Sequence, residues 1–179
     1  MKCSISKVLV VMIELLCCLY QAFGMNLVME NFEQTHGQDV LWMEIRARKY
    51  NRTTTVVNGT IHMYQEGTND YQFNLDIFFS RLGNQQYNHL PIKLPSVDIC
   101  DFIDYIYKNY PGYMSLFING PKEGECPIKV RDIHVLDVEF PKHAIPQIIM
   151  REGYYKAVVT SYLHGKQVIS YYTVLKATN

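Results

Sequence analysis

Apolar and polar residues alternate with a period of two along most of the chain, which is the pattern of half-buried β-strands. Residues 41–48, 57–64 and 71–79 each alternate in this way. Between the second and third runs, residues 66–70 read Glu-Gly-Thr-Asn-Asp, a turn composition, so we expect a β-hairpin there. The phase of the three runs turns one set of apolar side chains towards the interior, among them Ile45, Met63, Phe73, Leu75 and Phe79.

Two further alternating runs, residues 154–164 and 167–175, lie near the C-terminus. Gly165-Lys166 separates them, and a two-residue loop with Gly first suits a type II′ hairpin turn. That turn would place Val159 opposite Tyr172, and cross-strand partners share one face of a sheet. We therefore expect Val159 and Tyr172 to face the interior together.

One helix interrupts the β pattern at residues 96–110. Ser96 is the expected N-cap, Lys108 lies in the last turn, and Pro111-Gly112 ends the helix. An apolar stripe at helical spacing consists of Ile99, Ile103, Ile106 and Tyr110. With further strands expected at residues 113–118 and 128–140, the chain has about seven or eight strands and one helix. This predicts a mainly β fold, an antiparallel two-sheet β-sandwich or cup of immunoglobulin-like type.

The first 24 residues have the layout of a secretory signal peptide. Lys2 and Lys7 precede an apolar run from Val8 to Tyr20, and small residues follow before Gly24. A membrane anchor is the alternative, but a spanning helix needs about 20 apolar residues and this run is shorter. We therefore expect a leader at residues 1–24, a single β-sandwich domain at residues 25–179, and a secreted, extracellular protein.

Cysteines and glycosylation motifs indicate the same compartment. Of the five cysteines, only Cys100 and Cys126 remain after the leader is removed, and such a pair in an oxidising environment favours a disulfide. Two unpaired thiols or half of a metal site are the alternatives, although no His or other Cys is close to either residue in sequence. Two Asn-x-Thr motifs make Asn51 and Asn58 the candidate glycosylation sites.

Charge and motif content exclude several classes of function. The chain has 17 basic and 17 acidic residues, and this balance argues against a nucleic-acid partner. It contains no G-x-S-x-G elbow, no phosphate-binding glycine loop and no H-E-x-x-H motif, and its six histidines are scattered. We therefore expect no enzymatic activity, no catalytic residues, no metal and no cofactor.

The aromatic content of 13% has two interpretations. The simpler one is a well-filled β core. The other is a cavity, because small residues on the inner faces (Ala47, Gly59, Ala157, Ser161 and Ser170) would leave volume, and a sizeable apolar void usually houses a ligand. Under the second interpretation, the expected ligand-binding residues are Ile45, Met63, Phe73, Leu75, Phe79, Val159 and Tyr172, with the irregular-looking residues 80–95 as a gate.

The order of several motifs resembles a known family. The motifs are Asn51-Arg52-Thr53, Val97-Asp98-Ile99-Cys100-Asp101-Phe102-Ile103, Cys126-Pro127-Ile128, Pro146 and Gly153-Tyr154-Tyr155. Together, over about residues 46–175, they resemble a family of secreted insect proteins of unknown function, DUF1091, which includes the chemosensory CheB proteins. The family is distantly similar to ML-type lipid-recognition domains. Members often carry additional cysteines near the N-terminus of the domain, and this chain lacks them.

The resemblance implies a sandwich or cup whose two sheets part to admit a lipid, and its cysteine positions match Cys100 and Cys126. We therefore expect a secreted binding or carrier protein for a hydrophobic small molecule or lipid, acting in insect chemosensation. The alternative is an extracellular protein–protein interaction module that uses an outer sheet face, because the other phase of the last hairpin, including Tyr162 and Tyr171, is also apolar. Its partner would be a receptor or another extracellular protein.

Overall fold

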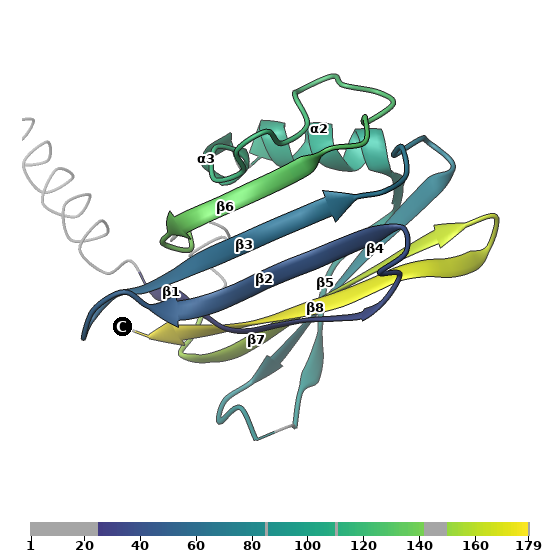
Figure 1. Ribbon diagram of the computed structural model, residues 1–179. Coiled ribbons are helices and arrows are strands. Elements are labelled where there is room, and N and C mark those ends of the chain that lie inside the picture. Colours follow the sequence, from purple (N-terminus) through teal and green to yellow (C-terminus); the bar gives the residue numbers. More distant parts are fainter. Residues whose placement is uncertain (1–24, 85, 110, 142–149, 179) are drawn as a thin grey trace, which may run out of the picture.

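The computed structural model describes residues 25–84, 86–109, 111–141 and 150–178 (Figure 1). The predicted leader at residues 1–24, Tyr110 of the helical stripe and Pro146 lie outside the described residues. Within the described part, no helix has the length and apolar character needed to cross a membrane.

Two antiparallel sheets form a β-sandwich, as the alternating pattern predicts. The larger sheet has five strands in the order β1 (Asn26–His36), β8 (Lys166–Thr178), β7 (Gly153–Leu163), β4 (Tyr71–Ser80) and β5 (Asn88–Asp98). The smaller sheet has three strands in the order β2 (Leu41–Lys49), β3 (Thr55–Met63) and β6 (Asp132–Val138). Neighbouring strands of a sheet lie about 4.8 Å apart, so three strands cannot cover the full width of five.

On one side of the sandwich β1 and β2 run next to each other (Figure 1), and the side chain of Gln34 joins them by hydrogen bonds. Its Nε2 donates to the carbonyl oxygen of Leu41, and its Oε1 accepts a hydrogen bond of 2.8 Å from the backbone N–H of Met43. The carboxamide therefore acts as a peptide group between the two sheets and satisfies backbone groups at the exposed edge of β2.

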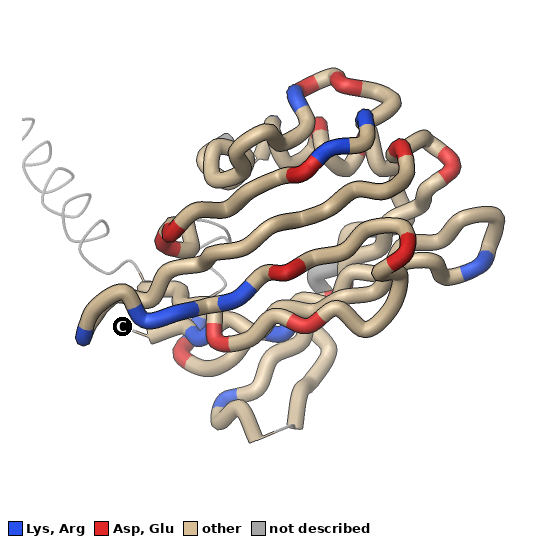
Figure 2. Tube along the Cα trace, viewed as in Figure 1, with Lys and Arg blue, Asp and Glu red and all other residues tan. Residues whose placement is uncertain are grey.

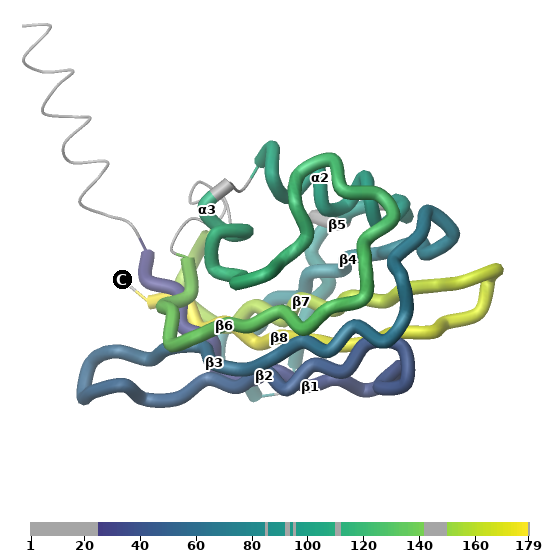
Figure 3. The backbone as a smooth tube through the Cα atoms, turned by 45° about the horizontal axis from the view of Figure 1, so that its top comes forward, coloured from purple at the N-terminus to yellow at the C-terminus, as the bar shows by residue number. Residues whose placement is uncertain are grey.

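Helices α2 (Ile99–Asn109) and α3 (Pro111–Met114) lie on the opposite side, beyond β6 (Figures 1 and 3). α2 packs against β4 and β5, the part of the larger sheet that the three-stranded sheet does not reach, and α3 packs against α2. A disulfide between Cys100 in the first turn of α2 and Cys126 fastens α2 to the loop that leads into β6. The pairing predicted from the sequence is therefore confirmed, with the two Cα atoms 5.8 Å apart.

Several element predictions are wrong, each for a local reason. β1 was not predicted, because an irregularity between Met29 and Asn31 breaks its alternation. Residues 88–98 form β5 rather than an irregular gate, since an edge strand tolerates its Pro residues. The strand predicted at residues 113–118 is instead the end of α3 followed by turns. The one predicted at residues 128–140 extends only over β6.

Ser96 is not the N-cap of the helix, because β5 continues to Asp98 and α2 begins at Ile99. The Ser96 hydroxyl instead donates to Oε1 of Gln72 on β4, at 3.3 Å. Asp101 in the first turn and Lys108 in the last turn of α2 agree with the prediction.

The register of the β7–β8 hairpin also differs from the prediction. His164 and Gly165 both have positive φ, 50° and 77°, so they form the two-residue turn, and Leu163 pairs with Lys166. This turn moves the pairing by two residues from the predicted register, and a shift between Ser161 and Tyr162 moves it back by one. As a result Val159 lies opposite Tyr171, whereas the predicted turn places it opposite Tyr172.

Candidate ligand-binding cavity

A cavity of about 560 Å³ lies between the two sheets and beneath the helices. This volume is within the range of small-molecule sites. The larger sheet contributes the longest wall: Tyr71, Phe73, Leu75 and Ile77 from β4, Leu90 and Leu94 from β5, Tyr155, Ala157 and Val159 from β7, and Ile169, Tyr171, Thr173 and Leu175 from β8. The smaller sheet contributes Leu41 and Met43 from β2, Ile61 and Met63 from β3, and Ile133 from β6.

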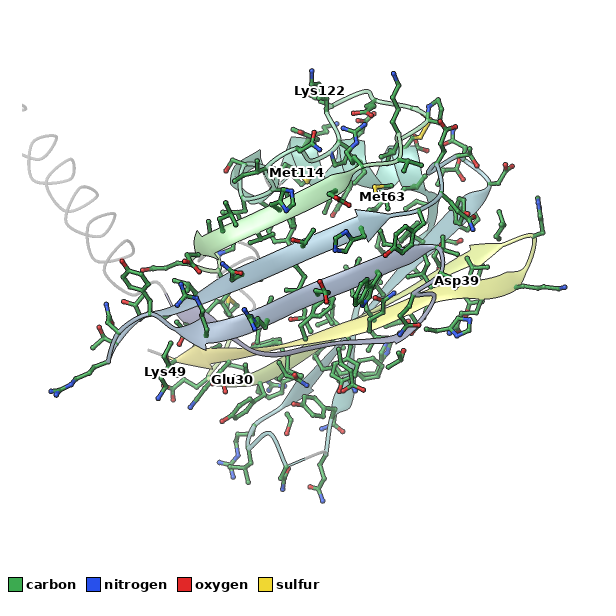
Figure 4. All side chains as sticks on the ribbon, viewed as in Figure 1. Glu30, Asp39, Lys49, Met63, Met114 and Lys122 are labelled. Atoms are coloured by element: carbon green, nitrogen blue, oxygen red, sulfur yellow. A yellow bond between two sulfur atoms is a disulfide. The ribbon has the colours of Figure 1, made fainter. Side chains whose placement is uncertain are left out.

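The third wall comes from α2, α3 and the loop after them. Ile99, Ile103 and Ile106 of the predicted apolar stripe line the cavity. Phe102 and Tyr105 from α2, Tyr113 and Met114 from α3, and Phe117 and Pro121 from the loop complete this wall. Figure 4 marks Met63 and Met114, which reach the cavity from β3 and α3, while Lys49, Glu30 and Lys122 lie at the periphery.

The packed core forms two separate clusters rather than one. The first cluster, near the start of β1 and the end of β8, includes Met25, Leu27, Phe79 and Ala177. The second includes Tyr71, Phe73, Val159 and Ile169, which also line the cavity. The sandwich is therefore filled at one end by side chains and hollow over much of the rest.

Four of the seven predicted ligand-binding residues line the cavity: Met63, Phe73, Leu75 and Val159. Phe79 does not, because it is buried in the first core cluster, where its ring lies 5.0 Å from that of Tyr155. Ile45 packs against the same cluster. Strand phase correctly turns both side chains inward, but it does not say which end of the sandwich is filled.

Tyr172 lies on the outer face of β8, which corrects its predicted place in the site. Its hydroxyl donates to the Glu33 carboxylate, and the Lys156 Nζ lies 3.9 Å from the centre of its ring. Tyr171 lines the cavity in its place. A one-residue difference in register moves every side chain of a strand to the other face, and this also turns Ile169 and Leu175 inward.

The small residues predicted to create the void contribute little to it. Of the five, only Ala157 lines the cavity. Ala47 packs against the first core cluster. At Gly59 the backbone is in close contact with β2, since a Cβ there would lie 2.0 Å from the carbonyl oxygen of Glu44. The cavity follows instead from covering a five-stranded sheet with three strands and two helices.

Tyr113, Met114 and Phe117 are cavity residues that the sequence analysis missed. The sequence pattern predicts a strand of the β core over these residues, although Pro111-Gly112 before them favours a turn or a helix start. The apolar stripe of α2 was recognised, but as a core face. Only the packing of α2 and α3 against the larger sheet shows that these residues line a void.

The cavity wall is almost uncharged. Glu66 is its one charged side chain among the described residues, and it is exposed at the surface. Figure 2 shows many of the basic and acidic residues in turns and along β2, which is an edge strand of the smaller sheet. Burial raises the pKa of Tyr113 and of Tyr171, so both phenols are uncharged at physiological pH.

Some hydroxyl groups in the wall have protein partners. Tyr71 donates to Oε1 of Gln65 at 2.9 Å. The Tyr155 hydroxyl accepts a hydrogen bond of 2.9 Å from the backbone N–H of Arg151 and donates to the Arg151 carbonyl oxygen at 3.1 Å. The hydroxyl groups of Tyr71 and Tyr155 therefore already have hydrogen-bond partners within the protein.

The predicted glycosylation sites differ in their surroundings. Asn51 is exposed in the β2–β3 turn, where its Oδ1 accepts hydrogen bonds from Thr53 and Thr54 while its Nδ2 points to no described partner. Asn58 is half-buried in β3, and its Nδ2 donates to Oδ1 of Asp137 at 2.8 Å. Asp137 also forms an ion pair with Arg48.

Three aromatic side chains form a row on the outer face of the smaller sheet. Trp42 is 40% exposed and Tyr64 50% exposed. The ring of His62 lies between them, with centroid distances of 5.5 Å to Trp42 and 6.3 Å to Tyr64. Within the described residues, no group of three His, Cys, Asp or Glu side chains is arranged to hold a metal ion.

A model of a known protein family matches the middle of the chain. Residues 73–157, just under half of the chain, match the family described as "Protein of unknown function (DUF1091)". This segment extends from β4 through α2 and β6 into β7, so it includes the helices, both cysteines and much of the larger sheet's wall. No curated protein is significantly similar to the chain.

Proposed function

We propose that this chain is a secreted binding or carrier protein for a hydrophobic small molecule or lipid. The observation that carries the proposal is the cavity of about 560 Å³ with an almost entirely apolar wall. Protein interiors are normally close-packed, and an apolar void of this size is costly unless a ligand fills it. The match to the DUF1091 family, as a family of unknown function, neither supports nor opposes a ligand.

The driving force for binding would be the removal of ligand surface from water, at about 0.8 kcal/mol for each buried methylene. A water-sized group occupies about 30 Å³ in a liquid, so the cavity has room for on the order of 20 non-hydrogen atoms. One acyl chain or a small terpenoid has this size. The leader-like N-terminus and the disulfide support a location outside the cell for this activity. The resemblance to CheB and ML-type proteins supports a role in insect chemosensation.

Native mass spectrometry tests the proposal. The full chain is expressed in insect cells and purified, and its mass is measured before and after extraction with organic solvent. We expect a co-purifying hydrophobic molecule, or saturable uptake of long-chain alcohols and esters by the extracted protein. Trp42→Ser, on the outer face, should bind equally well. An extracted protein that remains folded and takes up none of these molecules would exclude the carrier function.

A second candidate function is protein–protein interaction through an outer face. The row formed by Trp42, His62 and Tyr64 is the observation that favours it, since exposed aromatic groups are enriched at interfaces. Tyr171, which was predicted to belong to such an outer face, does not support this function because it faces the cavity. Replacing Trp42 and Tyr64 by Ser should abolish capture of an extracellular partner and leave ligand uptake intact if this function holds.

A further inference from the structure

Tyr113 and Tyr171 differ from Tyr71 and Tyr155, two other phenols of the cavity wall, because their hydroxyl groups have no hydrogen-bond partner among the described residues. Tyr71 and Tyr155 are hydrogen-bonded within the protein. Among the described residues, neither the Tyr113 nor the Tyr171 hydroxyl has a hydrogen bond, and neither oxygen is fully enclosed by protein atoms, so both are open to the cavity that their side chains line. Polar groups inside a protein are normally paired, so two unpaired hydroxyls in one cavity indicate that a ligand supplies the partner.

Apolar contacts fix both rings in place. The Tyr113 ring lies 5.4 Å from that of Phe117 and 6.2 Å from that of Phe140. The Tyr171 ring lies 5.6 Å from that of Phe32. Tyr113 belongs to the helical cover and Tyr171 to the larger sheet, so the two hydroxyls approach the cavity from different walls. Each phenol remains protonated at physiological pH, because burial raises its pKa, and the neighbouring Tyr113 raises that of Tyr171 further.

The wall offers nothing to neutralise a negative charge. Its described residues include no Lys, Arg or His, and the one charged side chain, Glu66, is acidic. An ionised carboxylate or phosphate moved into such surroundings would lose its hydration without gaining a cation. Phenolic hydroxyls, by contrast, suit a neutral oxygen, because they both donate and accept hydrogen bonds.

We propose that Tyr113 and Tyr171 form a polar anchor that binds one neutral oxygen of the ligand, a hydroxyl or a carbonyl. The cavity therefore selects uncharged hydrophobic molecules with one oxygen-containing group, such as long-chain alcohols, ketones and esters, over fatty-acid anions, and the anchor gives them a hydrogen bond that a plain hydrocarbon lacks. This inference rests on the proposed carrier function and adds the chemical class of its ligand.

The test compares three probes of equal chain length, dodecane, 1-dodecanol and dodecanoate, with the solvent-extracted protein at pH 8. Binding is measured by displacement of a fluorescent apolar dye, in the native protein, in a Tyr113→Phe/Tyr171→Phe variant and in a Tyr172→Phe control. Tyr→Phe keeps the ring and removes only the hydroxyl, and Tyr172 lies outside the cavity. Circular dichroism and thermal unfolding confirm that each variant is folded.

In the native protein we expect dodecanoate to bind at least about a hundredfold more weakly than 1-dodecanol. We also expect the ratio of the 1-dodecanol affinity to the dodecane affinity to be higher than in the double variant. The double variant should weaken the alcohol roughly two- to tenfold, the worth of a neutral hydrogen bond, and leave dodecane unchanged or tighter. Tyr172→Phe should leave all three affinities unchanged.

Each other outcome separates the two proposals. If none of the probes binds to the native protein, the carrier function itself is contradicted. If dodecane and the alcohol bind but the double variant weakens neither, or if dodecanoate binds as well as the alcohol, the carrier function stands and the neutral anchor is wrong.

Discussion

Val159 of β7 lies directly opposite Tyr171 of β8, and both side chains line the cavity. This pairing results from the turn at His164-Gly165 and the irregularity between Ser161 and Tyr162. The pairing determines that Tyr171, rather than Tyr172, faces the cavity. The hydroxyl that we assign to the polar anchor therefore depends on turn geometry a few residues away along the hairpin.

The first prediction concerns that turn. Since His164 has a φ of 50°, His164→Val should lower the free energy of unfolding by about 1–2 kcal/mol, because a β-branched residue is strained in the left-handed region. Lys166→Val, at the start of β8, should change it by less than about 0.5 kcal/mol. Urea unfolding measures both. A larger loss in Lys166→Val than in His164→Val would favour the turn at Gly165-Lys166 instead.

The second prediction tests whether the void is real. Ala157 lines the cavity and Ala177, 1% exposed, is in the packed core, so the same change to Leu should act oppositely at the two sites. Ala157→Leu should weaken binding of 1-dodecanol at least about tenfold without lowering Tm, because its added carbons enter empty space. Ala177→Leu should destabilise by about 1–3 kcal/mol through overpacking. Equal destabilisation at both sites would show that the centre is solid.

The third prediction concerns Ser161, which is completely buried on β7 and whose hydroxyl has no hydrogen-bond partner among the described residues. Ser161→Ala should raise the free energy of unfolding by about 1 kcal/mol, because it removes the desolvation cost of an unpaired hydroxyl. Ser170→Ala, whose side chain is only half-buried, serves as the control and should have little effect. Destabilisation by Ser161→Ala in denaturant titrations would indicate a bound partner for this hydroxyl, such as a buried water.

The fourth prediction concerns the loop that the disulfide fastens to α2. The backbone N–H of Lys122, then the Arg131 guanidinium and then the backbone N–H of Lys129 hold the pKa of Glu125 below its ordinary value of 4.5. A depressed carboxyl pKa stabilises the fold above the unfolded-state pKa, and this contribution is lost as the pH falls through the folded-state value. Glu125→Gln should therefore destabilise by about 1 kcal/mol at pH 7.

The difference between the native protein and Glu125→Gln should shrink as the pH falls below about 4.5, where the carboxyl of Glu125 becomes protonated. Glu123→Gln in the same loop, where Glu123 is exposed, should behave like the native protein at every pH. Thermal unfolding from pH 7 to pH 3 gives the comparison. A constant difference across this range would mean that the Glu125 charge does not stabilise the loop.

Local pattern was sufficient to predict the class of fold. The period-two alternation of β4 predicts the inward set Tyr71, Phe73, Leu75 and Ile77, and all four line the cavity. The helix was also predicted, because helical spacing of apolar residues can be seen within a short segment. The disulfide was predicted correctly because only two cysteines remain after the expected leader. Four of the predicted site residues, Met63, Phe73, Leu75 and Val159, line the cavity and follow from strand phase alone.

Tertiary structure decided where along the sandwich the space lies. Phe79 and Leu75 share one face of β4, yet Phe79 is in the packed end and Leu75 lines the cavity, since packing depends on what the opposite layer presents. Tyr113 became a wall residue because the three-stranded sheet leaves β4 and β5 for the helices to cover. The alternation of a strand fixes which side chains point inward, but only the distance between layers and the register of their strands determine whether those side chains meet one another or enclose a void.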